Sequence, residues 1–177
     1  MRSRFPSRNG RWSAPGLSTG NLVLCILVAA IMILGGIMVY RSVDVQKQVA
    51  VTFVGWYEDK KGYDKALADQ KAMHKPMLVY IYAPWCPHCK RFSAEVLADR
   101  RMQAFVQAYP HVRIAPDDGD AEKKIMADFG AQGYPSFYVV MPDQKRIQIE
   151  TFIADPRPRL KTPIEFMKSI LQATGGQ

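Results

Sequence analysis

The sequence is poor in residues that bind metals: its 177 residues include three cysteines and three histidines. A structural zinc site needs four ligands, usually supplied as two pairs, and only Cys86 and Cys89 stand close together. His88 lies between them, where the start of a helix would aim it elsewhere, and His74 and His111 are distant in the sequence. We therefore expect no metal site. A copper-carrying module stays open as an alternative, because thiolates suit Cu(I).

Acidic residues are absent from the first 20 residues, which contain Arg2, Arg4, Arg8 and Arg11. These four arginines supply half of the formal net charge of +8. A basic arm of this kind, residues 1–21, could bind nucleic acid. Because an apolar run follows it directly, we interpret its charge as a determinant of membrane topology and expect no nucleic-acid binding.

The apolar run covers residues 22–40, LVLCILVAAIMILGGIMVY, and contains no charged residue. As a helix it would be roughly 28 Å long, which is close to the hydrocarbon thickness of a bilayer. A cleaved signal peptide usually has a shorter apolar stretch, of about 7 to 15 residues, and a small-residue cleavage site after it. No convincing site follows Tyr40. The run predicts an uncleaved transmembrane anchor, and a long, removable signal peptide is the alternative.

The orientation of this anchor follows from the flanking charges. Four arginines precede the run, whereas the other side begins with Arg41, Asp44 and Lys47 and is less basic. The positive-inside rule places the N-terminus in the cytoplasm and residues 41–177 across the membrane. In a bacterium this is a single-pass inner-membrane protein with a periplasmic domain.

After the apolar run, the sequence alternates between strand and helix patterns. Residues 41–54 are predicted to form a linker and a first strand, and residues 55–177 are predicted to form one domain. The predicted strands cover residues 49–54, 77–82, 112–115, 133–141 and 146–153, and the predicted helices cover 63–74, 86–109, 121–129 and 162–174. Helices between strands imply parallel crossovers, and the last two strands form an antiparallel hairpin. The fold class is α/β, a mixed central sheet flanked by helices.

The cysteine pair begins the helix that follows the strand 77–82. A structural disulfide between Cys86 and Cys89 would close a loop of two residues and constrain the unfolded chain very little, so redox exchange is favoured. Unpaired N–H groups at a helix start stabilise a thiolate at Cys86, and the thiolate is the attacking species in disulfide exchange. Cys89, one turn later, is placed to resolve the mixed disulfide.

Three neighbours of the pair are further candidates for the site. Pro87 stiffens the turn and removes an N–H that would have no helical acceptor. His88 adds a hydrogen-bonding or positive group near the thiolate, which favours the reduced form and makes the disulfide a stronger oxidant. Trp85 would shield the pair while leaving one sulfur accessible to a substrate, and simple packing is the alternative for this residue.

The sequence Trp-Cys-x-x-Cys-Lys after a buried strand, with Gly133-Tyr134-Pro135 ahead of a later strand, resembles the thioredoxin superfamily. The resemblance implies a thioredoxin fold and thiol–disulfide exchange without a dissociable cofactor. It also implies that Pro135 is cis and lies against the active disulfide, and that the backbone of Tyr134 pairs with an extended substrate.

Within the superfamily, residues 55–175 are similar to the C-terminal periplasmic domain of the electron transporter DsbD, whereas the dipeptide Pro87-His88 resembles the oxidant DsbA. Two positions that carry acids in such proteins are Tyr80 and Ser93 here. With less negative charge to raise the thiol pKa values, the pair is predicted to be more oxidising than a dedicated reductant. The proton acceptor for Cys89 stays open, with Tyr80 and water as candidates.

The sequence therefore predicts a membrane-tethered periplasmic thiol:disulfide oxidoreductase that uses Cys86 and Cys89. Its expected partners are substrate proteins with cysteine thiols or disulfides, together with a membrane electron donor or acceptor. Two alternatives from other classes are a non-catalytic assembly module with a thioredoxin fold and a copper chaperone of the envelope. The direction of electron flow is not determined by the sequence.

Overall fold

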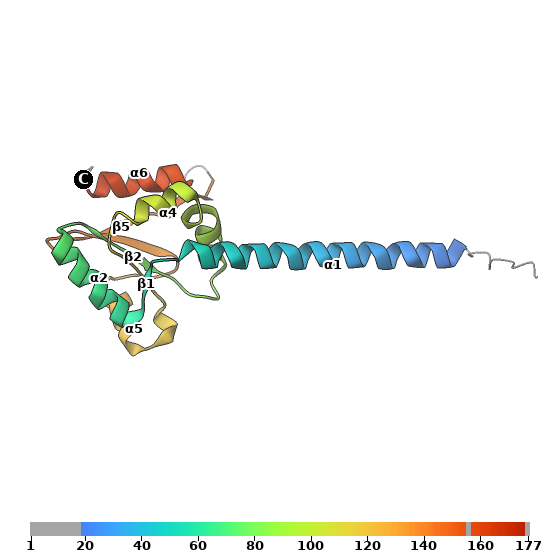
Figure 1. Ribbon diagram of the computed structural model, residues 1–177, viewed down its shortest axis with the longest axis horizontal. Coiled ribbons are helices and arrows are strands. Elements are labelled where there is room, and N and C mark those ends of the chain that lie inside the picture. The colour runs from blue at the N-terminus through green and yellow to red at the C-terminus, as the bar shows by residue number, and fades with distance from the viewer. Residues whose placement is uncertain (1–18, 155–156, 176–177) are drawn as a thin grey trace, which may run out of the picture. The chain divides into compact units, whose positions relative to one another are not determined.

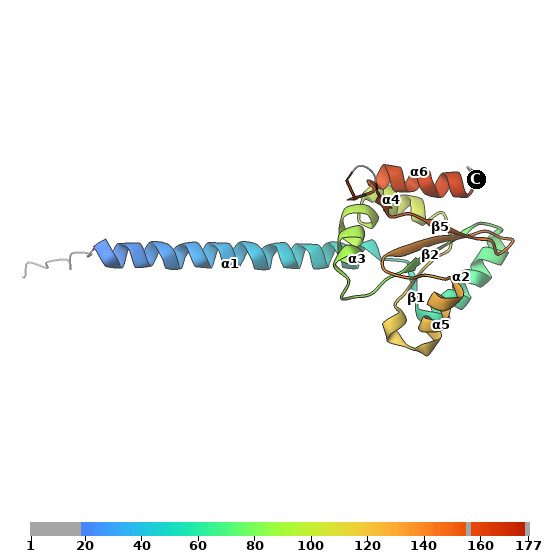
Figure 2. The ribbon, with the colours of Figure 1, turned by 180° about the vertical axis from the view of Figure 1, so that it is seen from behind.

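The computed structural model describes residues 19–154 and 157–175, and the chain divides into two units between Val43 and Asp44. Each unit is described by itself. The predicted basic arm covers residues 1–21, and its residues 1–18 lie outside the described part of the chain. Figures 1 and 2 show the ribbon from two opposite sides.

Helix α1 (Thr19–Thr52) contains the apolar run. Its segment Val23–Ser42 is 20 residues long and is apolar enough to cross a membrane, by length and composition alone. A signal sequence near an N-terminus would have the same properties. The side chains of residues 23–42 are exposed.

The strand predicted over residues 49–54 is wrong. Helix α1 continues to Thr52, and the chain then turns through Gly55, whose φ of 85° lies in the left-handed region. The first strand is β1 (Tyr57–Glu58). In an apolar run this short, periodicity cannot distinguish a strand from a helix. The prediction therefore depended on the content of β-branched residues alone, and this signal was misleading here.

The central sheet has five strands in the order β1-β3-β2-β4-β5. After β1, these are β2 (Met77–Ile81), β3 (His111–Ile114), β4 (Ser136–Val140) and β5 (Arg146–Ile149). Strands β1, β3 and β2 are parallel, whereas β4 is antiparallel to β2 and β5 is antiparallel to β4. The mixed sheet and its terminal hairpin are confirmed.

The parallel crossover expected into β4 is wrong. Helix α5 (Asp120–Asp128) has nine residues and does not return the chain to the end at which β3 began. Strand β4 therefore enters the sheet at the end where β3 leaves it, and it runs in the opposite direction.

Helices cover both faces of the sheet. In Figure 1, α4 (Arg100–Val106) and α6 (Pro163–Ala173) lie above the sheet, and α2 (Asp59–Met73) and α5 lie below it. Strand β2 is buried throughout and its side chains alternate between the two cores: Leu78 and Tyr80 belong to the α4–α6 side and Val79 to the α2–α5 side. A strand buried on both faces reads as a continuous apolar run, as predicted here.

The single helix predicted over residues 86–109 is broken into three segments. These are α3 (Pro87–Phe92), a π-helical turn η1 (Ser93–Leu97) and α4. The carboxylate of Asp99 accepts hydrogen bonds from the backbone N–H groups of Arg101 and Met102. Asp99 thus caps the N-terminus of α4, and a new helix begins at Arg100. Aspartate favours such caps over helix interiors.

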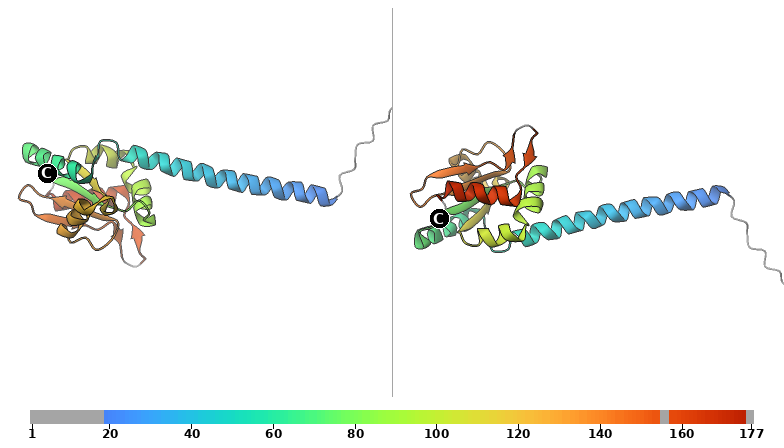
Figure 3. Two further views of the ribbon diagram at one scale, coloured as in Figure 1. Left: turned by 90° about the horizontal axis from the view of Figure 1, so that it is seen from below. Right: turned by 90° about the horizontal axis from the view of Figure 1, so that it is seen from above.

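The strand predicted over residues 146–153 is also divided. Strand β5 ends at Ile149, and β6 (Phe152–Ile153) pairs with β7 (Arg159–Leu160) in a separate two-stranded ribbon. Both views in Figure 3 show this ribbon beside α3.

A buried histidine couples the stability of this domain to pH. His111 is 6% exposed, its Nδ1 donates to the carbonyl oxygen of Tyr109 at 2.7 Å, and its ring meets Trp56 edge-on at 4.9 Å. Burial lowers the pKa of His111 below its ordinary value of 6.5, and the hydrogen bond to Tyr109 opposes that shift. As the pH falls below 6.5, the unfolded chain therefore takes up a proton that the folded domain takes up only at a lower pH.

We expect His111 to leave the free energy of unfolding unchanged above pH 6.5. As the pH falls below 6.5, the free energy of unfolding should decrease. The slope is at most about 1.4 kcal/mol per pH unit, because one proton is involved. Urea unfolding from pH 5 to pH 8 measures it. His111→Phe should remove this part of the slope, whereas His74→Asn, at an exposed position with a left-handed backbone, should keep it. An unchanged slope in His111→Phe would exclude His111 as the cause.

Candidate functional site

The cysteine pair lies at the start of helix α3, which follows strand β2 in the chain. Cys86 is the residue before the first turn of α3, with an extended backbone (φ −71°, ψ 117°), and Pro87 occupies the first helical position. The backbone N–H of Cys89 donates to the sulfur of Cys86, with an N···S distance of 3.3 Å. The predicted helix start at Cys86 is confirmed, and its sulfur acts as the acceptor that a helix start requires.

A second backbone group meets Cys86 from a distant part of the chain. The Cys86 thiol donates to the carbonyl oxygen of Tyr134 at 3.8 Å, and the peptide bond between Tyr134 and Pro135 is cis. Strand β4 begins directly after this bond, at Ser136. The structure thus brings together the two sequence motifs that are separated by about 48 residues.

Both sulfurs are buried, and Cys89 is the deeper of the two. Cys86 is 5% exposed and Cys89 is 2% exposed, and both are free thiols. Burial, followed by a hydrogen bond with Cys86, raises the pKa of Cys89 to about 12, although a backbone hydrogen bond from Ala83 and one from Tyr80 lower it. Cys89 is therefore a neutral thiol at physiological pH.

Trp85 forms an oriented, exposed platform beside the pair. Its side chain is 64% exposed, so it does not fill the core. The indole Nε1 donates to a carboxylate oxygen of Asp117 at 2.6 Å, and the ring meets Tyr134 edge-on at 5.9 Å. Asp117 was missed as a site residue, because nothing in the acidic loop indicates which aspartate faces the tryptophan.

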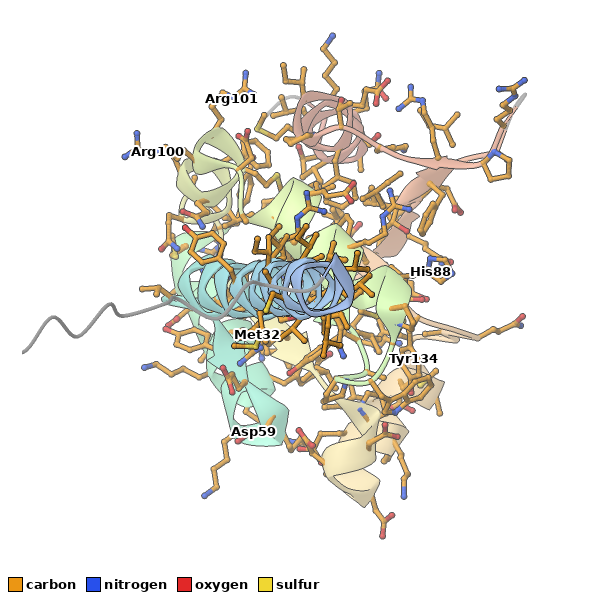
Figure 4. All side chains as sticks on the ribbon, turned by 90° about the vertical axis from the view of Figure 1, so that its right-hand side faces the viewer. Met32, Asp59, His88, Arg100, Arg101 and Tyr134 are labelled. Atoms are coloured by element: carbon orange, nitrogen blue, oxygen red, sulfur yellow. The ribbon has the colours of Figure 1, made fainter. Side chains whose placement is uncertain are left out.

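His88 lies on the surface of the first turn of α3. Its ring is perpendicular to that of Phe152 in β6, with 5.5 Å between the ring centres. Figure 4 labels His88 and Tyr134 on the same side of the domain, and Arg100 and Arg101 on the other. Phe152 was also missed by the sequence, because its contact depends on the fold of the β6–β7 ribbon.

Tyr80 and Ser93, which stand where related proteins carry acids, lie close to each other beside Cys89. The hydroxyl of Tyr80 lies 3.4 Å from the carbonyl oxygen of Cys89 and 3.5 Å from the hydroxyl of Ser93. Burial raises the pKa of Tyr80 well above 10.

Within the described residues, no group of three or more His, Cys, Asp or Glu side chains is placed to hold a metal ion.

The strand order, the helices on both faces and the cysteine pair opposite a cis-proline define a domain with the thioredoxin fold. Residues 56–142 match the sequence model of the family described as Thioredoxin-like. This part of the chain is a thioredoxin-like domain, as the resemblance implied.

Solved structures of other proteins share this fold, among them the two that follow. The C-terminal domain of Neisseria meningitidis DsbD in its oxidised form is 21% identical, covers 67% of this chain and 98% of that one, and gives a TM-score of 0.53. A thioredoxin from Thermus thermophilus is 21% identical, covers 68% of this chain and 88% of that one, and gives a TM-score of 0.52. At this level of identity, the likeness establishes the fold alone.

Among characterised relatives, a protein disulfide-isomerase from Hordeum vulgare is 38% identical over 76 residues. The matched segment is 43% of this chain and 14% of the relative. The protein disulfide-isomerase erp38 from Neurospora crassa is 40% identical over 62 residues, 35% of this chain and 16% of the relative. The chain thus spans about a seventh of the length of these relatives.

Proposed function

We propose that this protein is a membrane-tethered thiol:disulfide oxidoreductase whose Cys86–Cys89 pair exchanges electrons with cysteines of substrate proteins. The single observation that carries the proposal is the setting of Cys86. Its sulfur receives the N–H of Cys89 on one side and faces the Tyr134 carbonyl, next to the cis bond, on the other. The likeness to protein disulfide-isomerases supports the same chemistry.

In the reducing direction, the Cys86 thiolate attacks a substrate disulfide, one substrate sulfur leaves as a thiolate, and a mixed disulfide forms at Cys86. Cys89 then attacks the Cys86 sulfur and releases the second substrate thiolate. The pair is oxidised by two electrons and the substrate disulfide is reduced by two. The reverse sequence oxidises a substrate dithiol.

The surroundings of the pair supply a place for the substrate chain. The exposed ring of Trp85, held by Asp117, stands beside Tyr134 and offers apolar contact to residues that flank a substrate cysteine. The backbone of Tyr134 precedes the cis bond and offers hydrogen bonds to an extended segment. We assign substrate binding to Trp85 and Tyr134, and positioning of the mixed disulfide to Pro135.

We further propose that Pro87 and His88 make the pair oxidising. Pro87 opens α3 without an N–H to be satisfied, and His88 is exposed on the same turn. A hydrogen-bonding or positive imidazole next to the Cys86 thiolate stabilises the dithiol form and so raises the reduction potential.

Equilibration of the full-length chain in glutathione buffers tests the function, with the fraction of Cys86–Cys89 disulfide read from alkylation mass shifts. We expect one reversible two-electron transition with a midpoint between about −180 and −120 mV. His88→Gln should move it toward reducing values by about 30 mV or more. Failure of the two cysteines to form a reversible disulfide would refute the function.

The control for this measurement is His74→Asn, which removes an exposed imidazole at the end of α2 and should leave the midpoint unchanged. A midpoint near about −270 mV would refute the oxidising assignment while leaving the exchange function in place.

We also propose that α1 anchors the domain with residues 41–177 in the periplasm and the N-terminus in the cytoplasm of a bacterial inner membrane. The support is the apolar segment Val23–Ser42 and the excess of arginine before it. Protease added to spheroplasts is expected to digest the domain, and carbonate extraction should leave it in the membrane fraction. A protected domain, or a chain shortened at a site after residue 40, would contradict this topology.

A further inference from the structure

Strand β6 brings an aromatic ring to the helix that carries the cysteine pair. The ring of Phe152 is perpendicular to that of His88, with 5.5 Å between the ring centres. Both views in Figure 3 show the β6–β7 ribbon beside α3. His88 is exposed on the first turn of α3, two residues after Cys86. An edge-to-face pair is attractive, so it favours one rotamer of an exposed imidazole by about two- to tenfold.

The position of Phe152 is fixed by the base of the ribbon. Phe152 pairs with Leu160 across the ribbon, and Leu160 is buried in the core on the α4–α6 side. The backbone N–H of Lys161 donates to the carbonyl oxygen of Thr151 at 3.0 Å, and Thr151 is itself buried. The ring of Phe152 packs against the same core. The ribbon therefore presents this ring at a defined place, to which the exposed imidazole adapts.

The sulfur of Cys86 has hydrogen-bond partners other than His88. It accepts the N–H of Cys89 at 3.3 Å, and its thiol donates to the carbonyl oxygen of Tyr134 at 3.8 Å. In the described part of the chain, these hydrogen bonds do not include one from the imidazole, which lies against Phe152 while both cysteines are free thiols. A hydrogen bond from His88 to this sulfur would have to replace the contact with Phe152.

We propose that Phe152 is a positioning residue, which holds the imidazole of His88 away from Cys86 and so limits how oxidising the cysteine pair is. The inference rests on the proposed function, in which His88 stabilises the Cys86 thiolate. A hydrogen bond from His88 to a thiolate is charge-assisted, whereas the sulfurs of the disulfide are neutral and gain little from it. Because the contact with Phe152 competes with this hydrogen bond, it weakens the stabilisation of the dithiol form and lowers the reduction potential.

A purely structural role for Phe152 has a different consequence. If its ring only packed against the core, its loss would destabilise the dithiol and disulfide forms alike, and the equilibrium between them would stay constant. The reduction potential therefore separates positioning of His88 from packing of the ribbon.

The test measures the equilibrium of the full-length chain with glutathione at pH 7, with Cys25→Ser in every variant. The dithiol gives two electrons and two protons to oxidised glutathione, which yields the Cys86–Cys89 disulfide and two molecules of reduced glutathione. Phe152→Leu keeps an apolar side chain and removes the ring. We expect its equilibrium constant for disulfide formation to be about two- to tenfold smaller than that of the parent. Tenfold corresponds to about 30 mV toward oxidising potentials.

Three further variants serve as controls. Phe152→Tyr keeps the ring and should reproduce the parent. Phe105→Leu makes the same substitution at another partly buried ring against the same core, on α4, and should leave the constant unchanged. In a His88→Gln background, Phe152→Leu should have no effect, because the imidazole through which it acts is gone.

A measurement on the unsubstituted, reduced chain does not depend on any variant folding. In detergent micelles, with isotope-labelled histidine, a nuclear Overhauser effect should connect the rings of His88 and Phe152. Its absence would overturn the inference. So would a Phe152→Leu constant equal to or larger than that of the parent, or a Phe152→Leu shift that persists in the His88→Gln background. If the parent forms no reversible disulfide, the proposed function itself fails and the inference falls with it, and the parent alone shows that result.

Discussion

Replacement of Cys89 by serine is expected to trap substrates on Cys86 as stable mixed disulfides. The reason is geometric: Cys89 stands one helical turn after Cys86, and its N–H already contacts the Cys86 sulfur at 3.3 Å. Attack within one site replaces a reaction between two molecules and gains greatly in rate. Without this attack, the mixed disulfide must wait for an external thiol, and its lifetime should rise roughly a hundredfold or more.

Cells that produce the Cys89→Ser variant are lysed in acid to quench exchange, and adducts are resolved on non-reducing gels. High-molecular-weight species that collapse on reduction are the expected result. Cys86→Ser should show none, because no sulfur remains to hold the substrate in the position facing Tyr134. Cys25→Ser in the same background should leave the adducts unchanged and so exclude the third cysteine as their source.

The result also separates the alternatives. A folded Cys89→Ser protein without adducts would favour a non-catalytic assembly module. Copper that co-purifies with the parent chain and is lost in Cys86→Ser would favour a copper chaperone, because thiolates suit Cu(I).

The local part of this site could be predicted from the sequence. The apolar run 77–82 between Pro76 and Pro84 indicated a buried strand, and β2 covers Met77–Ile81. The last helix was predicted over 162–174, and α6 covers Pro163–Ala173 with a capping box at Thr162. Such signals depend on residues close together in the chain, so their physical cause is contained in the sequence itself.

The contacts between distant segments could not be predicted in this way. Asp117 is 32 residues from Trp85, and Phe152 approaches His88 only because β6 leaves the sheet to pair with β7. The direction of β4 depends on how far α5 carries the chain. In each case the deciding quantity is the placement of a segment in space, which no local pattern encodes. The cis-proline was reached through a resemblance, because its partner Cys86 is 48 residues away from Tyr134.

Phe166→Ala is expected to cause the largest loss of stability. Phe166 is fully buried in α6, and its ring meets Phe92 at 5.0 Å and Phe137 at 4.9 Å, both nearly edge-on. Removal of a buried phenyl ring loses its transfer free energy and leaves a cavity. The free energy of unfolding should therefore fall by about 3 to 5 kcal/mol, measured by urea denaturation. Ile164→Ala, on the same helix but 44% exposed, should change it by less than about 1 kcal/mol.

The same variant tests how the core supports the cysteines. Phe92 is the last residue of α3, the helix that carries Cys86 at its start, so a cavity beneath Phe92 removes packing from the helix that orients the pair. If that packing is equal in the dithiol and disulfide forms, both lose the same stability and the reduction potential stays constant. We expect this result, because Phe92 and Phe166 belong to the core cluster on the α4–α6 side, whereas the two cysteines pack in a separate cluster with Ala83. A potential that shifted by about 30 mV or more would contradict it, since that shift equals about 1.4 kcal/mol of unequal stabilisation between the two forms.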